Sequence, residues 1–173
     1  WRDAENLPTL SPMLRLIVIT GCVMGGSHAV AAEPLPGPVP AEVVRVIDGD
    51  TVEVRARIWP GQFVETRVRL RGVDTPETRR PDCEAERSAG EAATAFTTRW
   101  LTRPDLDPGS ADEASWRPVS LHEVDLGSFA GRVVAGVKRA DGADLALDLS
   151  AAGLAVAYGE DGPWCAPSGD ASR

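Results

Sequence analysis

The strongest constraint on the fold is a series of three short segments that alternate apolar and polar residues and are separated by tight turns. Residues 43–47 are apolar and β-branched, and an Asp-Gly-Asp turn follows at 48–50. Residues 51–57 alternate with a period of two, a Pro-Gly turn follows at 60–61, and residues 66–73 alternate again. Such alternation is typical of half-buried strands, and Gly or Pro between the runs is typical of hairpin turns. We therefore predict three consecutive antiparallel strands.

The rest of the chain predicts two more strands and two helices. Residues 83–101 are rich in Ala and Glu and carry apolar residues at helical spacing. Residues 119–124 and 132–137 are strand-like, and a short helix over 144–152 is stopped by Gly153, which suits the left-handed position after a helix. Five short strands interrupted by a helix predict an α+β fold. We expect a five-stranded Greek-key barrel of the OB type, with one long and one short helix packed on it.

Net charge limits the class of partner. The 173 residues carry a formal charge of −8, which opposes nucleic-acid binding because neutralisation of phosphates drives that binding. Between residues 43 and 80, however, eight arginines outnumber six acidic residues, so the acidic excess lies elsewhere. The charge therefore predicts weak non-specific affinity for nucleic acid and does not exclude phosphate chemistry.

The N-terminal residues are typical of an export signal. Met13 precedes an apolar run at 16–19, and small residues follow as far as Ala32. We expect residues 1–32 to be an N-terminal extension and signal peptide that starts at Met13 and ends in an A-x-A cleavage site. The protein is then periplasmic or secreted. The apolar run is too short to span a membrane, and a buried strand is its alternative interpretation.

The remaining domain boundaries follow from composition. Residues 33–41 are Pro-rich and predict an extended linker, residues 42–165 form the folded domain, and residues 166–173 form a flexible tail. A second export variant is a lipid anchor, because residues 19–22 resemble a lipobox that would acylate Cys22.

Two cysteines remain after the expected cleavage. An exported protein with Cys83 and Cys165 is expected to pair them, which would tie the region after the second acidic segment to the C-terminal tail. Two free, semi-buried thiols are the alternative. The chain has no C-x-x-C motif, and His28 and His122 are isolated, so we expect no zinc site.

Two acidic segments flank the arginine-rich third strand. Asp50 ends the first turn and Asp74 lies just past the third strand, so both can reach one rim of a barrel. Two carboxylates with backbone carbonyls and waters suit calcium or magnesium. Glu77 is suited to deprotonate a water, and Arg69 can donate two hydrogen bonds to a phosphate. The structural alternatives are a plain turn at Asp50, a solvated strand face at Arg69 and a helix N-terminus at 74–77.

Together these motifs resemble the thermonuclease family, the staphylococcal nuclease-like proteins. The motifs that carry the resemblance are IDGDTV at 47–52, VRL at 68–70 and VDTPET at 73–78, with further similarity at 91–97, 129–132 and 149–155. The resemblance runs from about residue 43 to residue 165. It implies an OB barrel with helices packed against it, which agrees with the pattern of strands.

The resemblance also implies a function and a site. The function is calcium-dependent hydrolysis of phosphodiester bonds in DNA and RNA, as an endonuclease or exonuclease, by in-line attack of water. The implied calcium ligands are Asp50, Asp74 and the backbone carbonyl of Thr75, and the implied catalytic residues are Arg69, Glu77 and Arg132. The glutamate activates the water, and the two arginines bind the scissile phosphate. We expect a monomer with DNA and RNA as substrates and no stable protein partner.

The chain departs from the basic prototype of the family in two respects. It is acidic, and it has few aromatic residues to stack on a nucleotide: Phe129 stands where the prototype has a tyrosine, and Tyr158 is the only tyrosine. A non-catalytic OB module that binds nucleic acid or protein is the alternative function. A nuclease that acts on small nucleotides is a third reading.

Overall fold

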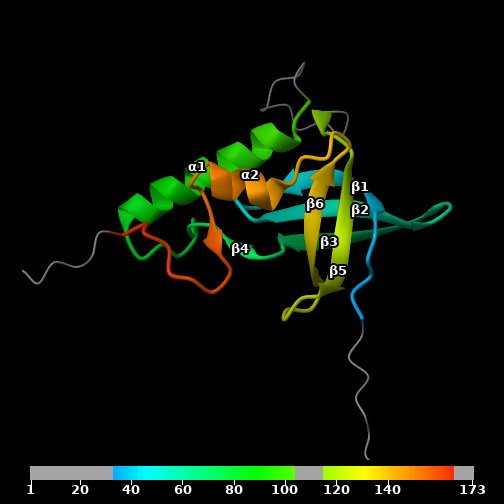
Figure 1. Ribbon diagram of the computed structural model, residues 1–173, viewed down its shortest axis with the longest axis horizontal. Helices are drawn as coiled ribbons and strands as arrows, with labels where there is room; N and C mark the ends of the chain where they lie inside the picture. The colour runs from blue at the N-terminus through cyan, green and yellow to red at the C-terminus, as the bar shows by residue number, and fades with distance from the viewer. Residues whose placement is uncertain (1–32, 104–114, 166–173) are drawn as a thin grey trace, which may run out of the picture. The chain divides into compact units, whose positions relative to one another are not determined.

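Five strands close into a barrel in the computed structural model, which describes residues 33–103 and 115–165 (Figure 1). They are β1 (Val39–Val46), β2 (Thr51–Trp59), β3 (Gln62–Leu70), β5 (Val119–Leu126) and β6 (Arg132–Arg139). The strand order is β1-β2-β3-β6-β5, and β5 pairs back with β1. Only the β3–β6 pair among them is parallel. This arrangement confirms the predicted α+β class and the OB-type barrel.

The interior of the barrel is filled by side chains that point inward from every second strand position. Those with almost no exposed surface are Val43, Val52, Val54, Val68, Leu70, Leu121, Ala135 and Val137. Each fully buried Val or Leu contributes roughly 1.5–3 kcal/mol through removal of apolar surface from water. Because the period is two, Arg67 and Arg69 point to the opposite face of β3 from Val68 and Leu70, as the sequence predicts.

Strand β1 begins earlier than the sequence predicts. The residues expected to form a linker include Val39 and Pro40, which pair with β5 in the structure, and Ala41, which is buried in the core. Upstream of them, Leu35 forms a further bridge to Val124. A proline lacks an amide proton, but its carbonyl and its neighbours still pair, so part of the Pro-rich segment is built into the barrel.

Two helices lie side by side against the barrel (Figure 1), as expected. Helix α1 (Glu84–Leu101) begins after Cys83, whose Sγ accepts a hydrogen bond of 3.3 Å from the Glu86 amide. Helix α2 (Leu145–Ala151) begins after Asp144, which accepts hydrogen bonds from two amides of the first turn. Gly153 follows α2 with a φ of 70°, the left-handed conformation predicted for it.

The C-terminal segment is tied back to the site region at two places. Strand β7 (Val156–Ala157) pairs with β4 (Val73–Asp74) in a small separate sheet. A disulfide joins Cys83 to Cys165, with the two Cα atoms 5.9 Å apart. Two-residue strands are too short for a periodicity argument, so the sequence does not indicate the β4–β7 pair.

The chain divides into two units, residues 1–31 and residues 32–173, and every described residue belongs to the second. The expected signal peptide, the anchor site Cys22 and the tail at 166–173 lie outside the described residues. Within residues 33–103 and 115–165, neither helix is long and apolar enough to cross a membrane.

Candidate active site

The turn between β1 and β2 presses against α1, and this contact fixes Asp50. A Cβ atom on Gly49 would lie 2.7 Å from the Cβ of Ala93 and 2.8 Å from the Oγ1 of Thr75, so only glycine fits. The carbonyl of Gly49 accepts a 2.7 Å hydrogen bond from the buried Thr97 hydroxyl of α1. The helix therefore holds the turn that carries the first predicted metal ligand.

The carboxylate of Asp50 is almost completely buried and accepts three hydrogen bonds. Its residue is 3% exposed. Oδ1 accepts hydrogen bonds of 2.9 Å from Arg69 Nη1 and from the Thr51 hydroxyl, and Oδ2 accepts one of 3.0 Å from the Thr75 amide. A buried carboxylate needs such partners, since an unpaired charge away from water is costly.

Asp74 completes the cluster from the other side of Arg69. Its Oδ1 forms an ion pair with Arg69 Nη2, and its Oδ2 accepts a 2.9 Å hydrogen bond from the Gly159 amide, just past β7. One guanidinium therefore bridges two aspartates from different turns. We call this group the Asp50–Arg69–Asp74 cluster.

Asp48 lies beside the cluster, and its surroundings disfavour its ionised form. Burial, together with the nearby negative charge of Asp50, raises the pKa of Asp48 from 3.8 to about 6. Its Oδ1 accepts a 3.3 Å hydrogen bond from the Asp50 amide and so helps to shape the turn. This contact suits a role for Asp48 in orienting the turn.

A pocket of about 350 Å³ brings Arg69 together with Arg132, as the resemblance implies. Arg132 opens β6, which runs parallel to β3, so the pairing of β6 with β3 brings the two arginines into one pocket. The Arg132 guanidinium lies 4.6 Å from the centre of the Phe129 ring, and its buried Nε has no hydrogen-bond partner among residues 33–103 and 115–165. Tyr158, which is 67% exposed, lines the same pocket, 5.7 Å from the Arg69 guanidinium.

Glu77 forms its hydrogen bonds within its own loop and with helix α1. Its carboxylate is exposed, and Oε1 accepts hydrogen bonds from the amides of Thr78 (2.9 Å) and Arg79 (3.1 Å). Its own amide donates to Glu86 of α1 at 3.3 Å. In the described part of the chain, Glu77 neither lines the arginine pocket nor bonds to the Asp50–Arg69–Asp74 cluster.

The backbone around Glu77 is positioned by Gly90 in the middle of α1. A Cβ atom on Gly90 would lie 2.7 Å from the Pro76 carbonyl oxygen and 2.7 Å from the Cγ2 of Thr78. Glycine is unfavourable inside a helix, by about 1 kcal/mol relative to alanine. Here the missing side chain lets the helix contact the loop at Pro76 and Thr78, which offsets the loss of helix stability.

The donor set suits a hard cation bound mainly through water and substrate. A carboxylate offers about four lone-pair positions. Asp50 accepts three hydrogen bonds and Asp74 takes part in two contacts, so both carboxylates keep unused lone pairs. Among residues 33–103 and 115–165, no group of three or more His, Cys, Asp or Glu side chains could hold a metal ion. Two carboxylates with waters and phosphate oxygens are a set that magnesium and calcium both accept.

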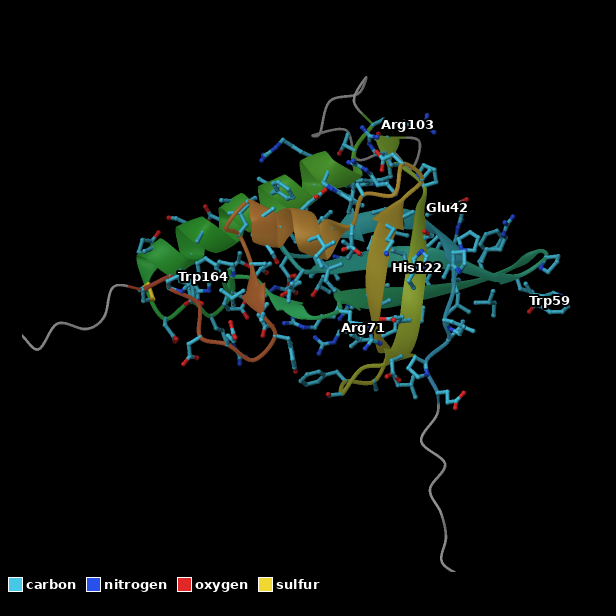
Figure 2. The ribbon with its side chains drawn as sticks, viewed as in Figure 1. Glu42, Trp59, Arg71, Arg103, His122 and Trp164 are labelled. Carbon is cyan, nitrogen blue, oxygen red and sulfur yellow. A yellow bond between two sulfur atoms is a disulfide. The ribbon has the colours of Figure 1, made fainter. Side chains whose placement is uncertain are left out.

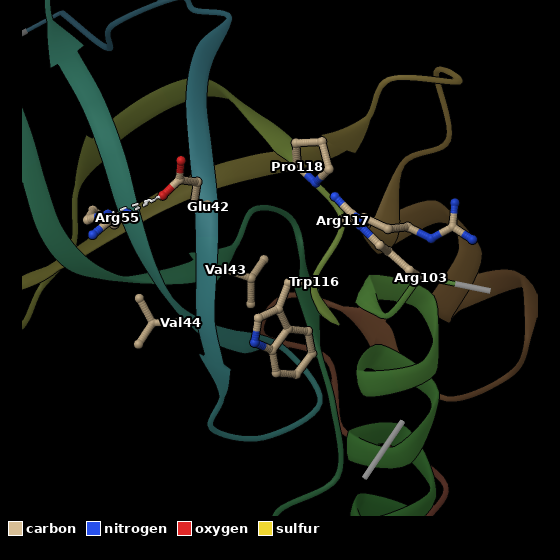
Figure 3. Close-up of a pocket in the computed structure, with 8 residues that line it drawn as sticks. All are labelled: Glu42, Val43, Val44, Arg55, Arg103, Trp116, Arg117 and Pro118. Carbon is tan, nitrogen blue, oxygen red and sulfur yellow. Dashed lines mark hydrogen bonds and ion pairs between the residues drawn. The ribbon is translucent and has the colours of Figure 1, made fainter. Parts of the chain in front are cut away.

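Other concave surfaces lie away from these residues. One pocket of about 200 Å³ is lined by Trp116, Arg117 and Arg103 among others, and contains none of the predicted site residues (Figure 3). Another pocket, which begins at Asp74 and Thr75, is acidic. Its acidic residues are Asp74, Asp82, Glu86, Glu160 and Asp161.

Two contacts at the site are not indicated by the sequence. The Gly159 amide reaches Asp74 only because β7 pairs with β4. Arg71 joins Arg69 and Arg132 in the pocket, although its place in an alternating strand marks it only as one more surface arginine. A search for arginines at the end of a strand would have found Arg71, whereas no local signal points to Gly159.

Comparison with known proteins supports the resemblance over part of the chain. A segment of 60 residues is 48% identical to the thermonuclease of Staphylococcus intermedius and covers 35% of this chain. The chain spans about a third of the length of that curated relative, since the match covers 32% of it. No family model matches the chain. The comparison and the barrel together support a thermonuclease-like protein.

Proposed function

We propose that the protein is a metal-dependent nuclease that hydrolyses phosphodiester bonds of DNA and RNA. The observation that carries the proposal is the shared pocket of Arg69 and Arg132 beside the two aspartates. These arginines come from strands far apart in the sequence, and both face one space large enough for a phosphate. The similarity to a thermonuclease supports the same reaction class.

The two arginines bind the phosphate and stabilise the charge that grows during the reaction. Arg132 lines the pocket together with Arg69, so its guanidinium group can donate hydrogen bonds to a phosphate oxygen there. Arg69 is held at a fixed position by Asp50 and Asp74, so its orientation is set before substrate binds. Fixed donors of this kind stabilise an anionic transition state without reorganisation.

The cation we propose is calcium, held by the carboxylates of Asp50 and Asp74 and by the Thr75 carbonyl. When bound, a divalent cation withdraws electron density from a phosphoryl oxygen. Asp48 keeps the turn at Asp50 in place through its hydrogen bond to the Asp50 amide.

Glu77 is proposed as the general base. Its carboxylate takes a proton from a water molecule while the water oxygen bonds to phosphorus and the bond from phosphorus to the leaving oxygen breaks. The leaving oxygen keeps the electron pair of that bond and takes up a proton from solvent. In the structure one carboxylate oxygen is held by the amides of Thr78 and Arg79, and the loop is anchored against Gly90. Rotation of the side chain away from these amides is therefore part of the proposal.

The test is a cleavage assay on single-stranded DNA and on RNA with calcium, magnesium or manganese. We expect the wild-type protein to cleave, and Glu77→Gln to lower turnover by about 10²–10⁴-fold with little change in stability. The matched control is Glu91→Gln, because Glu91 is an exposed glutamate of α1 outside the cluster. An unchanged rate in Glu77→Gln would place the base elsewhere, and intact substrates with all three metals would overturn the proposed function.

A non-catalytic OB module is the second candidate, and the position of Glu77 favours it. The glutamate lies outside the pocket that holds the arginines. A module of this kind binds oligonucleotide in a calorimeter and leaves it intact in the presence of metal. The same pair of measurements therefore separates the two candidates.

We also propose that the protein is exported to the periplasm or beyond, as a monomer. The disulfide between Cys83 and Cys165 supports an oxidising compartment. The mass of the mature protein distinguishes cleavage after Ala32 from acylation at Cys22.

A further inference from the structure

The pocket that holds Arg69 and Arg132 contains a third arginine with no part in the proposed mechanism. Arg71 follows β3 directly and lines the pocket with the other two. Figure 2 shows it near the end of the barrel where β5 leads into β6. Three guanidinium groups around one space of about 350 Å³ exceed what a single scissile phosphate needs.

The unpaired donors of the molecule concentrate in this pocket. Within the described residues, three buried side-chain polar atoms lack a hydrogen-bond partner, and two of them are the Nε atoms of Arg71 and Arg132. Most buried polar groups in native proteins are paired, so an orphan donor calls for an explanation. Both Nε atoms are covered by protein, so a negatively charged ligand in the pocket would be bound by the outer nitrogens of the two guanidinium groups.

A backbone carbonyl of β5 holds the Arg71 side chain in place. Its Nη2 donates a 2.5 Å hydrogen bond to the Glu123 carbonyl, which lies in a bulge of β5 where Glu123 has a φ of 51°. A left-handed glutamate costs of order 1 kcal/mol, and such strain gathers at functional sites. The carboxylates of Glu123 and Asp125 lie 3.7 and 4.0 Å from the guanidinium, beyond hydrogen-bond reach. Both are substantially exposed, so they offset the arginine charge only weakly.

The arginines follow one another along the wall of the pocket, which suits a chain of phosphates rather than one. Arg69 is the next-to-last residue of β3, and Arg71 lies in the turn that follows the strand, where its amide donates to the Ala135 carbonyl of β6. Leu70 between them is buried, and both arginines line the pocket. Positive side chains in succession along one wall can contact successive phosphates of a nucleotide chain. Arg69 forms ion pairs with two aspartates, whereas the two carboxylates near Arg71 lie beyond hydrogen-bond reach.

We propose that Arg71 binds the phosphate next to the scissile one, so that the site selects substrates with more than one phosphate. The inference rests on the proposed function, since it assigns a substrate subsite to the same pocket. Arg71 is then a positioning residue that raises affinity for oligonucleotides and leaves the chemical step unchanged.

The experiment compares two substrates in the wild-type protein, Arg71→Gln and Arg71→Lys. A dinucleoside monophosphate offers only the scissile phosphate, and a short single-stranded oligonucleotide offers flanking ones. We expect Arg71→Gln to raise KM for the oligonucleotide by about tenfold, with kcat unchanged, and to leave the dinucleoside monophosphate unaffected. Arg71→Lys restores most of the loss. The slope of log affinity against log salt falls by about 0.7 in Arg71→Gln, as for one lost phosphate contact.

Arg67→Gln is the matched control, because Arg67 is exposed on the same face of β3 and does not line the pocket. It is expected to leave both substrates and the salt slope unchanged. Equal losses on both substrates with an unchanged salt slope would overturn the proposal and make Arg71 a structural tie between β3 and β5.

Affinity is also measured by fluorescence anisotropy with a chelator present. If no substrate is cleaved by the wild-type protein, the proposed function fails, while weaker oligonucleotide binding by Arg71→Gln still supports the subsite. The subsite proposal is overturned if the wild-type protein and Arg71→Gln bind the oligonucleotide equally, or if neither binds it.

Discussion

The Asp50–Arg69–Asp74 cluster and the pocket wall around Arg132 are neighbours with opposite characters. In the cluster, every carboxylate oxygen accepts a hydrogen bond or forms an ion pair, and Asp50 is 3% exposed. At Arg132, a buried donor has no acceptor and the guanidinium rests on an exposed aromatic ring. One side of the site is satisfied by the protein itself, and the other side has bonding capacity left over.

This difference separates residues that hold the fold from residues that line the substrate pocket. The two aspartates belong to the first group and are proposed to bind the cation as well. Arg69 belongs to both groups, because it neutralises two aspartates and also faces the pocket. Arg132 belongs to the second group alone. Stability and activity should therefore respond differently to the loss of each arginine, although both are assigned to the same phosphate.

The largest effect is expected from Arg69→Gln, which damages both properties. Removing the guanidinium leaves two carboxylates without their cation, and breaking such a buried pair costs about 3–5 kcal/mol. We expect the free energy of unfolding to fall by about 3 kcal/mol and kcat/KM to fall by at least about 100-fold. Urea denaturation and steady-state kinetics measure the two. A variant that loses activity at full stability would show that the cluster is not a structural unit.

Arg132→Gln sharpens the comparison because only activity should change. The side chain has an orphan Nε and rests on Phe129, so we expect stability within about 0.5 kcal/mol of the wild type. The loss of a donor to the transition state lowers kcat by about 10²–10³-fold. The same two assays apply, with Arg67→Gln as a surface control. A large loss of stability here would erase the distinction between the two regions.

The disulfide tests whether the C-terminal segment supports the cluster. It closes a loop with a sequence separation of 82, and the segment it anchors supplies the Gly159 amide to Asp74. Replacing Cys83 and Cys165 by serine is expected to lower the free energy of unfolding by about 3 kcal/mol. We also expect a modest loss of activity, since Asp74 loses the support of its hydrogen bond from the Gly159 amide. If the double variant is as stable as the wild type, the segment contributes nothing to the satisfied side of the site.

Gly90→Ala is the smallest and most local of these changes. In an unconstrained helix this substitution stabilises by about 1 kcal/mol. Here the new methyl group would strike the Pro76 carbonyl and Thr78, so we expect destabilisation by about 1–2 kcal/mol and a several-fold drop in kcat. Ser88→Ala, at an exposed position of α1, serves as the control. A more stable Gly90→Ala protein would show that the loop around Glu77 does not depend on the helix.

Local patterns in the sequence predict much of the Asp50–Arg69–Asp74 cluster and little of the pocket wall around Arg132. Alternation gives the strands, the Asp-Gly-Asp turn gives Asp50, and the end of the third strand gives Arg69 and Asp74. All of these depend on residues close together in the chain. The shared pocket of Arg69 and Arg132 depends on the parallel pairing of β3 with β6, which no local pattern encodes. That pair of residues was expected only through the family resemblance.

The remaining differences have equally physical causes. The expected linker at 33–41 contributes to β1 because proline residues still offer carbonyls to a barrel edge. Glu77 follows Asp74 closely in sequence, yet its carboxylate turns to the amides of Thr78 and Arg79. A spacing argument places a residue near a site but does not choose among its local hydrogen bonds.

The most direct test of the account is the rate of hydrolysis of one single-stranded oligonucleotide as calcium is titrated from chelator-treated protein, with unfolding followed in parallel. We expect no cleavage in chelator, a saturable rise in rate with calcium, and a melting temperature that rises over the same concentrations because the ion binds the folded state. Cleavage that is unaffected by the chelator, or a folded protein that leaves the oligonucleotide intact at every concentration of calcium, magnesium and manganese, would contradict it.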